Sequence, residues 1–297
     1  MRTRLLLVLA VVAAAIIAVP AVRWWLDGPD LEGTGDPDLA PACPADPEQP
    51  ASEADGDSVP VGATSVLLCN GPGNGFQVPE DALTTRVDEL ARVVNAQDRA
   101  DYNGCPDDLG IGYRLVFGYP DGTAFDVTGQ LYGCRVLQVG KHEHTNPSKP
   151  WDLFIEALRE QRSAATPPGS DERPECLDRN GLVHSPIGDP GEMTDAVLCA
   201  RFWRKPERNG SAAFSATDLA VLLADRRDRP SLGDDGLTDE RCTADRREYD
   251  IVGITPWGDH VSMDGICGVV YDGDSYWEPG PEAREVITRL YDEADLG

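Results

Sequence analysis

The chain has 297 residues, enough for two domains of ordinary size. Its 52 acidic and 26 basic side chains give a formal net charge of −26. This balance argues against binding to nucleic acid or to an anionic lipid surface, because both require clustered Lys and Arg. We expect the acidic charge to keep an exposed protein soluble.

The N-terminal segment predicts a membrane anchor, which we assign to residues 1–25. Two arginines precede an uncharged apolar run at residues 5–22, close to the shortest length that spans a bilayer. The Arg-Trp-Trp that follows at 23–25 is typical of a membrane–water interface. The arginine distribution leaves the N-terminus in the cytoplasm and the rest outside. Cleavage of a signal peptide near residues 19–21 is the alternative and would give a secreted protein.

Composition divides the remainder into linkers and modules. Residues 26–62 form an acidic linker rich in Pro and Gly, which cannot bury enough apolar surface to fold alone. A second linker, at 163–174, contains the sequence Thr-Pro-Pro-Gly-Ser-Asp-Glu. We therefore expect module 1 at 63–162, with Cys43 tethered to it, and module 2 at 175–297.

The cysteines show that one module occurs twice. Four cysteines recur 130 to 137 residues later in the same order. Cys43, Cys69, Cys105 and Cys134 correspond to Cys176, Cys199, Cys242 and Cys267. An even number of cysteines beyond a membrane segment predicts disulfides. Zinc is a weak alternative because no Cys-x-x-Cys pair is present.

Module 1 reads as a strand at 61–69, a helix from Pro79, a hairpin of 113–119 and 123–128, a strand at 131–139 and a helix at 150–161. The first helix is indicated by five apolar residues at helical spacing: Leu83, Val87, Leu90, Ala91 and Val94. Acidic residues in its expected first turn would stabilise the helix, because they lie at the positive end of the helix dipole.

Module 2 repeats the order with strands at 196–203, 249–255, 260–263 and 265–271 and a final helix from Pro281. Its first helix begins at a capping box formed by Ser215 and Asp218. The expected fold class is α+β. We predict two tandem disulfide-bonded modules, each an antiparallel sheet with helices packed on one face, after an N-terminal transmembrane helix.

The predicted hairpins also suggest how the cysteines pair. Folding the first hairpin brings Cys105 towards Cys134, and the repeat then pairs Cys242 with Cys267. The remaining partners are Cys43 with Cys69 and Cys176 with Cys199. Each pair of this second kind joins a lead-in segment to a first strand, although sequence alone does not fix the connectivity.

Several short motifs follow one another in module 1. A strand ends with Leu67, Leu68 and Cys69, a Gly/Pro-rich loop occupies 71–75, and a helix follows Pro79. The later motifs are Cys105-Pro106, Asp121-Gly122 and Cys134. In this order they resemble the subtilisin-inhibitor family of actinobacterial secreted proteins, over residues 64–134. Module 2 shares less of the pattern. The family's second disulfide uses a helix cysteine, which neither module has.

The resemblance implies a rigid loop that enters a protease cleft. The scissile bond would join Asp107 to Asp108, directly after Pro106. In module 2 it would join Ala244 to Asp245. Subtilisin-like enzymes favour large apolar residues at this position, and Asp107 departs from that preference.

Two groups of residues invite a metal-binding interpretation. His142 and His144 form a His-x-His pair, and on a strand both rings would lie on the same face and could bind a metal. A solvated polar loop is the favoured interpretation. Asp272, Asp274 and Glu278 offer oxygen ligands for calcium without the spacing of an EF-hand, so an acidic turn is favoured. We expect no metal and no cofactor. The adjacent Asp107 and Asp108 show no catalytic partner in the sequence.

Exposed aromatic residues are the remaining binding candidates. Trp257 is expected at the tip of the second hairpin, where an exposed indole is a frequent interface anchor. If Tyr249 is exposed beside it, a protein or glycan contact becomes credible. Trp203 is expected to pack on a sheet.

These features favour a non-catalytic, membrane-anchored binding protein of the extracytoplasmic cell envelope with duplicated modules. Its partner would be an unknown envelope or secreted protein, and neither nucleic acid nor a cofactor is expected. No nucleophile elbow, zinc-protease or phosphate-binding motif is present, so we do not expect an enzyme. The alternative is a subtilisin-inhibitor-like protein whose partner is a serine protease.

Overall fold

The computed structural model describes residues 41–48, 56–101, 104–106, 108, 110–176, 184–201, 210–232, 241–242, 245, 247–273 and 275–296. The predicted anchor at 1–25 lies outside these residues, as does much of the 26–62 linker. Within the described part, no helix is long and apolar enough to cross a membrane. The chain divides into two units, Met1–Leu39 and Ala40–Gly297, and the fold below is that of the second.

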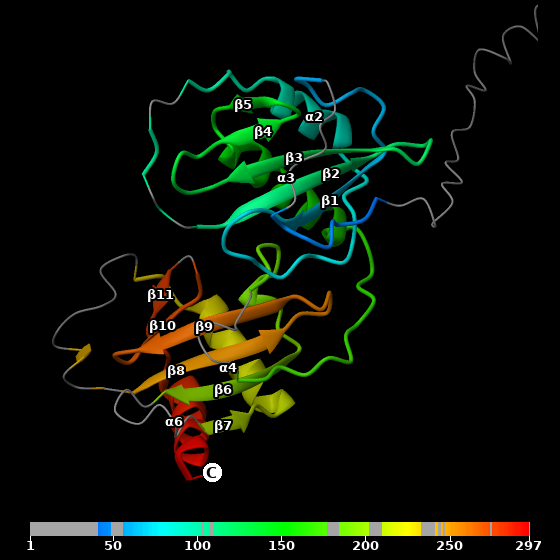
Figure 1. The fold of residues 1–297 in the computed structure, drawn as a ribbon. Helices are drawn as coiled ribbons and strands as arrows, with labels where there is room; N and C mark the ends of the chain where they lie inside the picture. Colours follow the sequence, from blue (N-terminus) through cyan, green and yellow to red (C-terminus); the bar gives the residue numbers. More distant parts are fainter. Residues whose placement is uncertain are drawn as a thin grey trace, which may run out of the picture. The chain divides into compact units, whose positions relative to one another are not determined.

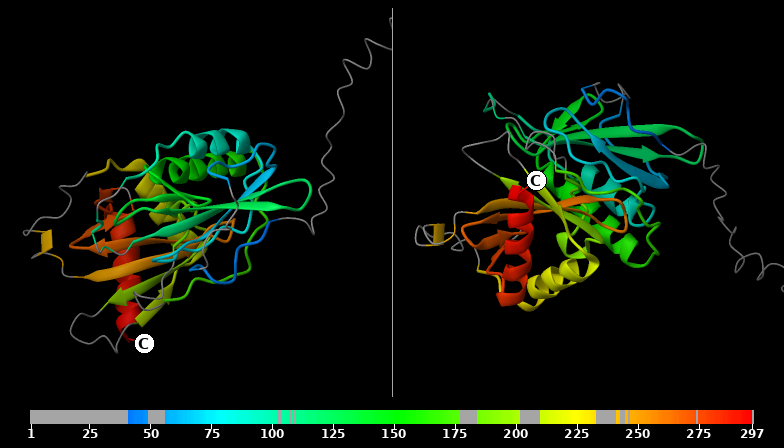
Figure 2. Two further views of the ribbon diagram at one scale, coloured as in Figure 1. Left: turned by 45° about the horizontal axis from the view of Figure 1, so that its top comes forward. Right: turned by 90° about the horizontal axis from the view of Figure 1, so that it is seen from below.

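The first sheet has five antiparallel strands in the order β1-β2-β3-β4-β5 (Figure 1). They are β1 (Ser65–Asn70), β2 (Gly112–Gly118), β3 (Ala124–Gln130), β4 (Leu137–Val139) and β5 (His142–His144). The helices α2 (Val87–Asn95) and α3 (Ser148–Ser163) pack against each other on one face of this sheet (Figure 2). The hairpin of β2 and β3 confirms the prediction for this segment.

The second sheet has six antiparallel strands in the order β11-β10-β9-β8-β6-β7. They are β6 (Asp195–Arg201), β7 (Gly210–Ala213), β8 (Glu248–Ile254), β9 (His260–Ile266), β10 (Val269–Tyr271) and β11 (Tyr276–Trp277). Two helices, α4 (Ala216–Asp228) and α6 (Pro281–Leu296), contact each other beside it, and a 3-10 turn η2 (Pro190–Glu192) precedes β6. The predicted α+β class with antiparallel sheets is confirmed.

Each sheet buries one face under its helices. In the first, strand residues such as Leu68, Leu115 and Val127 join helix residues such as Leu90 and Leu158 in one apolar cluster. The second sheet forms its own cluster on the same plan; it includes Leu198, Ile251, Met263, Leu222, Ile287 and Leu290. Alternation of apolar residues along the strands therefore places one hydrophobic core on each sheet.

The start of the first helix differs from the prediction. Helix α2 begins at Val87, after Arg86 in the left-handed conformation with φ 54°, and not at Pro79. Leu83 is buried, but it bridges Val66 of β1 through two backbone hydrogen bonds. Leu83 lies four residues before Val87, so its spacing also fits a helix, and periodicity cannot distinguish the two conformations.

Two predicted strands are shorter because their cysteines lie in turns. Cys134 lies between Gly133 and Arg135, whose φ angles are 61° and 51°, and β4 begins only at Leu137. Cys267 itself has φ 55°, and β10 begins at Val269. The expected loop at His142 and His144 is strand β5, so that prediction was wrong. The edge strands β7 and β11 were also not predicted.

A tyrosine packs over a glycine at the same place in each module. A Cβ atom on Gly129 would lie 2.2 Å from ring atoms of Tyr113, and one on Gly265 would lie 2.1 Å from those of Tyr249. Glycine is therefore required beneath each ring. Both tyrosines are almost fully buried, and this desolvation raises the pKa of both phenols well above their usual value of about 10.

We expect alkali to unfold the protein through these two phenols. A raised folded-state pKa means that their stabilisation is complete below about pH 10 and is lost as the pH rises further. Absorbance of phenolate should show a late, cooperative phase that coincides with loss of circular dichroism. Tyr249→Phe should reduce the late phase, whereas Tyr132→Phe, at a residue that is 49% exposed, should reduce the early one. Ionisation of all tyrosines before unfolding would contradict this expectation.

Candidate functional site

Four disulfides link the predicted cysteine pairs. They join Cys43 to Cys69, Cys105 to Cys134, Cys176 to Cys199 and Cys242 to Cys267. The predicted connectivity is confirmed. Four disulfides are typical of a protein that is secreted or otherwise outside the cytoplasm.

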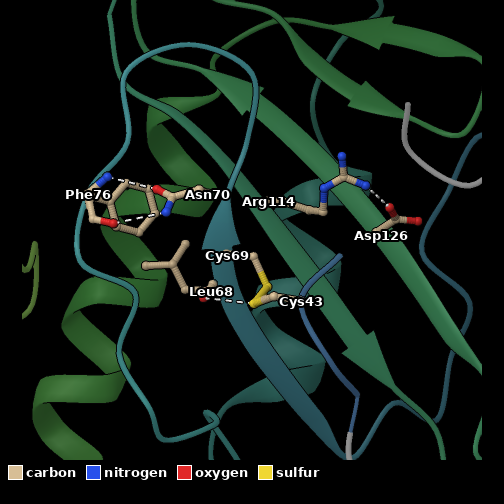
Figure 3. Close-up of a disulfide and its surroundings, with 7 residues drawn as sticks. All are labelled: Cys43, Leu68, Cys69, Asn70, Phe76, Arg114 and Asp126. Carbon is tan, nitrogen blue, oxygen red and sulfur yellow. Dashed lines mark hydrogen bonds and ion pairs between the residues drawn. A yellow bond between two sulfur atoms is a disulfide. The ribbon is translucent and has the colours of Figure 1, made fainter. Parts of the chain in front are cut away.

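The lead-in segment 41–48 crosses the face of the first sheet opposite its helices, over β1 and β2 (Figure 3). The disulfide fastens this segment to β1, beside an ion pair of 2.5 Å between Arg114 and Asp126. Arg114 is only 1% exposed, and it also donates to the carbonyl of Pro47. The lead-in segment therefore keeps a charged side chain away from water.

The second sheet carries a related arrangement, with an aspartate where the first sheet has its buried arginine. The disulfide from Cys176 reaches β6, and Asp250 of β8 stands at the repeat position of Arg114. Arg201 supplies the positive partner for Asp250 and also pairs with Asp264 at 3.5 Å. Each module therefore has an ion pair at the same position of its second long strand, but the pair joins β2 to β3 in module 1 and β8 to β6 in module 2.

Trp257 and Tyr249 do not form the predicted exposed pair. Tyr249 is 4% exposed and lies in the core, so it offers no surface to a partner. Trp257 is half-buried, and the guanidinium of Arg162 lies 4.9 Å from the centre of its ring. The expectation of an exposed hairpin tip was wrong because the tip is covered by α3. Trp203 lies outside the described residues.

The candidate reactive loops are only partly described. Pro106 and Asp108 are exposed next to Cys105, whereas Asp107 lies outside the described residues. In module 2, Ala244 also lies outside them, and the half-buried Asp245 accepts hydrogen bonds from Arg247. These bonds lower the pKa of Asp245 and hold its carboxylate in place.

The metal-binding candidates have other partners. His144 is buried, and its Nδ1 lies 2.9 Å from the carbonyl of Gln97. Asp272 pairs with Arg226, and Glu278 pairs with Arg241 and Arg284, which lower its pKa. Asp274 lies outside the described residues. Among the residues that the structure describes, no group of three acidic, His or Cys side chains is placed to hold a metal ion.

A buried charge network joins the two modules. Arg162, near the end of α3, donates to Asp81 of module 1 at 2.5 Å and to Asp259 of module 2 at 2.6 Å. Asp259, which follows the hairpin tip, is 3% exposed and also accepts from the hydroxyls of Ser185 and Thr255. Burial and charge-assisted hydrogen bonds hold the side chains of Asp81, Arg162 and Asp259 in one arrangement.

Neutral contacts extend this junction. Gln77 of module 1 donates to the carbonyl of Gly258 and accepts from the backbone N–H of His260. Ile187, from the lead-in of module 2, is 3% exposed and belongs to the apolar cluster of module 1. Arg159 donates to the carbonyl of Ile187. The modules are therefore docked through both apolar and polar contacts.

A cleft of about 1080 Å³ opens beside the junction. Its lining comes from the end of α3, the segment 184–192 and strand β9. Three arginines on its walls each bridge two aspartates. The sets are Asp81–Arg162–Asp259, Asp250–Arg201–Asp264 and Asp189–Arg226–Asp272.

In each of these sets one aspartate is much more buried than the other. The side chains of Asp250 and Asp259 are 6% and 4% exposed. Those of Asp189 and Asp264 are 53% and 54% exposed. The cleft therefore presents accessible carboxylates whose positions are fixed by arginines, and those arginines are anchored from behind.

Sequence reasoning missed the junction because arginine and aspartate are common in this chain. A comparison of the repeats contains one usable signal. Trp257 occupies the hairpin position at which module 1 has Asp121. Because large aromatic residues are buried on average, a tryptophan in a tight turn indicates that another part of the protein packs against it.

No protein-family model, curated protein or solved structure matches the chain. The resemblance to the subtilisin-inhibitor family therefore stays a prediction.

Proposed function

We propose that this chain is a non-catalytic, membrane-anchored binding protein of the extracytoplasmic cell envelope. The junction cleft is its binding element. The observation that carries the proposal is the position of this cleft, whose walls come from both modules. The Arg162 network fixes those walls relative to each other, so the site is preorganised and loses little entropy on binding.

The cleft also gives a reason for the duplication. Neither module supplies the whole lining, because Arg159 and Arg162 come from module 1 and Asp264 and Arg226 from module 2. The disulfides suit an oxidising environment, and the apolar run at 5–22 would keep the cleft near the membrane surface.

Filling the cleft should test this function. We expect soluble material released from the cell envelope to raise the melting temperature of the full chain, as any ligand of the native state does. Ser262→Trp places an indole in the cleft and should abolish the rise. Asp121→Trp adds the same side chain to the hairpin tip of module 1 and should leave it intact. An equal rise in all three proteins would show that the cleft is not the site.

The inhibitor function stays a prediction with less support. The exposure of Pro106 and Asp108 beside a disulfide favours it. The hydrogen bonds that hold Asp245 to Arg247 argue against a mobile substrate-like loop in module 2.

A further inference from the structure

We infer that the junction cleft binds a neutral oligosaccharide. This inference rests on the proposed binding function and names the chemical class of its ligand. It follows from the charges in the cleft, from the spacing of donors and acceptors, and from the aromatic walls.

The charge of the cleft disfavours an anion. Among the described residues, the lining holds five carboxylates and four guanidiniums, a net charge of −1. Two further carboxylates, those of Asp81 and Asp250, pair with Arg162 and Arg201 from behind the walls and add to this negative charge. The chain as a whole carries −26. A ligand with several carboxylates or phosphates would meet repulsion at short and at long range.

A polycation is disfavoured for a different reason. Asp264 and Asp189, the accessible carboxylates, each lie within 3.5 Å of a guanidinium, from Arg201 and Arg226. An ammonium group that approached either aspartate would also approach that arginine. Arg159 further occupies the α3 side of the cleft. Like charges this close reduce the attraction that the carboxylates would otherwise give.

Hydroxyl groups match what remains. A guanidinium only donates hydrogen bonds and an ionised carboxylate only accepts them, and here the two alternate within a few ångströms. A sugar hydroxyl both donates and accepts, so neighbouring hydroxyls satisfy such a pair without adding charge. Ser262 and Ser163 add hydroxyls of their own to the lining.

The walls also offer carbon surface and length. Trp257 and Tyr271 line the cleft and are both half-buried. Arg162 holds the ring of Trp257 in place, and Tyr276 lies against that of Tyr271. The apolar ring surface that lines the cleft can pack against the C–H groups of a sugar ring. The volume of about 1080 Å³ exceeds the usual range of roughly 300–1,000 Å³ for small-molecule pockets. An oligosaccharide fits these dimensions better than a single sugar.

The test compares three trisaccharides that differ in charge. The full chain, in a detergent without a sugar headgroup, is titrated calorimetrically with tri-N-acetylchitotriose, with the glucosamine trimer and with trigalacturonate. We expect saturable binding of the neutral compound and affinities at least about tenfold lower for the cationic and anionic ones. Maltotriose and xylotriose are added as further neutral probes.

Two rim variants locate the binding. Asp264→Ala and Asp189→Ala should each weaken the binding of the neutral trisaccharide at least about tenfold, because each removes an acceptor and one of the two carboxylates that position its arginine. Asp57→Ala is the matched control, since Asp57 is 56% exposed and pairs with Arg99 outside the cleft. It should leave the affinity unchanged.

The outcomes separate the two proposals. If none of the neutral trisaccharides binds while a charged trimer or the envelope material does, and Asp264→Ala weakens that binding, the saccharide inference is overturned and the binding function stands. If the neutral trisaccharide binds equally to Asp264→Ala and Asp57→Ala, the inference fails because the site lies elsewhere. If neither these probes nor the envelope material binds, both proposals fail.

Discussion

Replacing Arg162 with methionine is expected to lower the free energy of unfolding by about 3–5 kcal/mol, the range measured when one partner of a buried ion pair is removed. The side chain of Asp259 is 4% exposed and would lose its guanidinium partner at 2.6 Å. Its carboxylate would keep the hydroxyls of Ser185 and Thr255 as partners, which carry no charge to balance it. Urea unfolding of the oxidised protein gives the measurement.

Arg289→Met is the control for this variant. Arg289 also pairs with two carboxylates, Asp218 and Glu293, but its side chain is 45% exposed. Exposed pairs contribute about 0–1 kcal/mol, so a small effect is expected. Adding Asp259→Asn to Arg162→Met should restore part of the loss, because the uncompensated charge disappears. Equal effects of Arg162→Met and Arg289→Met would refute a stabilising role for the junction network.

The second large effect is expected when Cys43 and Cys69 are both replaced with alanine. The disulfide closes a separation of 26 residues, which corresponds to about 3–4 kcal/mol in the chain-entropy treatment. It also holds the lead-in segment over Arg114, which is 1% exposed. We therefore expect lower stability together with proteolytic cleavage within 41–48, detected by intact mass.

A second disulfide variant separates these two contributions. Cys105 and Cys134 close a similar separation of 29 residues. Cys105 is exposed, and this disulfide does not hold the lead-in segment over Arg114. Its double alanine variant should lose a similar chain-entropy contribution without exposing the lead-in segment to protease. Identical cleavage of the lead-in segment in both variants would show that the disulfide is not what holds it.

Local patterns account for most of the fold. The hairpin of β2 and β3, the helix from Pro281 and all four disulfides follow from alternation, from turn residues and from the repeat. The capping box is confirmed in part, because the Ser215 hydroxyl accepts from the N–H of Asp218. The Asp218 carboxylate instead accepts from Ser215 and Arg289. Contacts between residues that are near each other in the chain can therefore be predicted from the sequence.

The cleft could not be predicted in the same way. Asp81, Arg162 and Asp259 are far apart in the chain, and no periodicity relates them. Their meeting depends on how one module docks against the other, which is decided by shape and by Ile187 entering a neighbouring core. The error at Trp257 has the same origin, since a hairpin tip is exposed only when nothing is docked on it.

The docking of the modules also limits how the protein can assemble. Counting in the register of the cysteines, Arg159 and Arg162 of α3 correspond to Asp292 and Asp295 of α6, and Trp257 corresponds to Asp121. The arginines that receive the tip therefore have no counterpart at the matching positions of α6, and the inserting tryptophan has none at the matching position of module 1. A head-to-tail contact between like units would propagate into fibres. Because the two copies have diverged at these positions, the same residues cannot repeat this junction between successive modules.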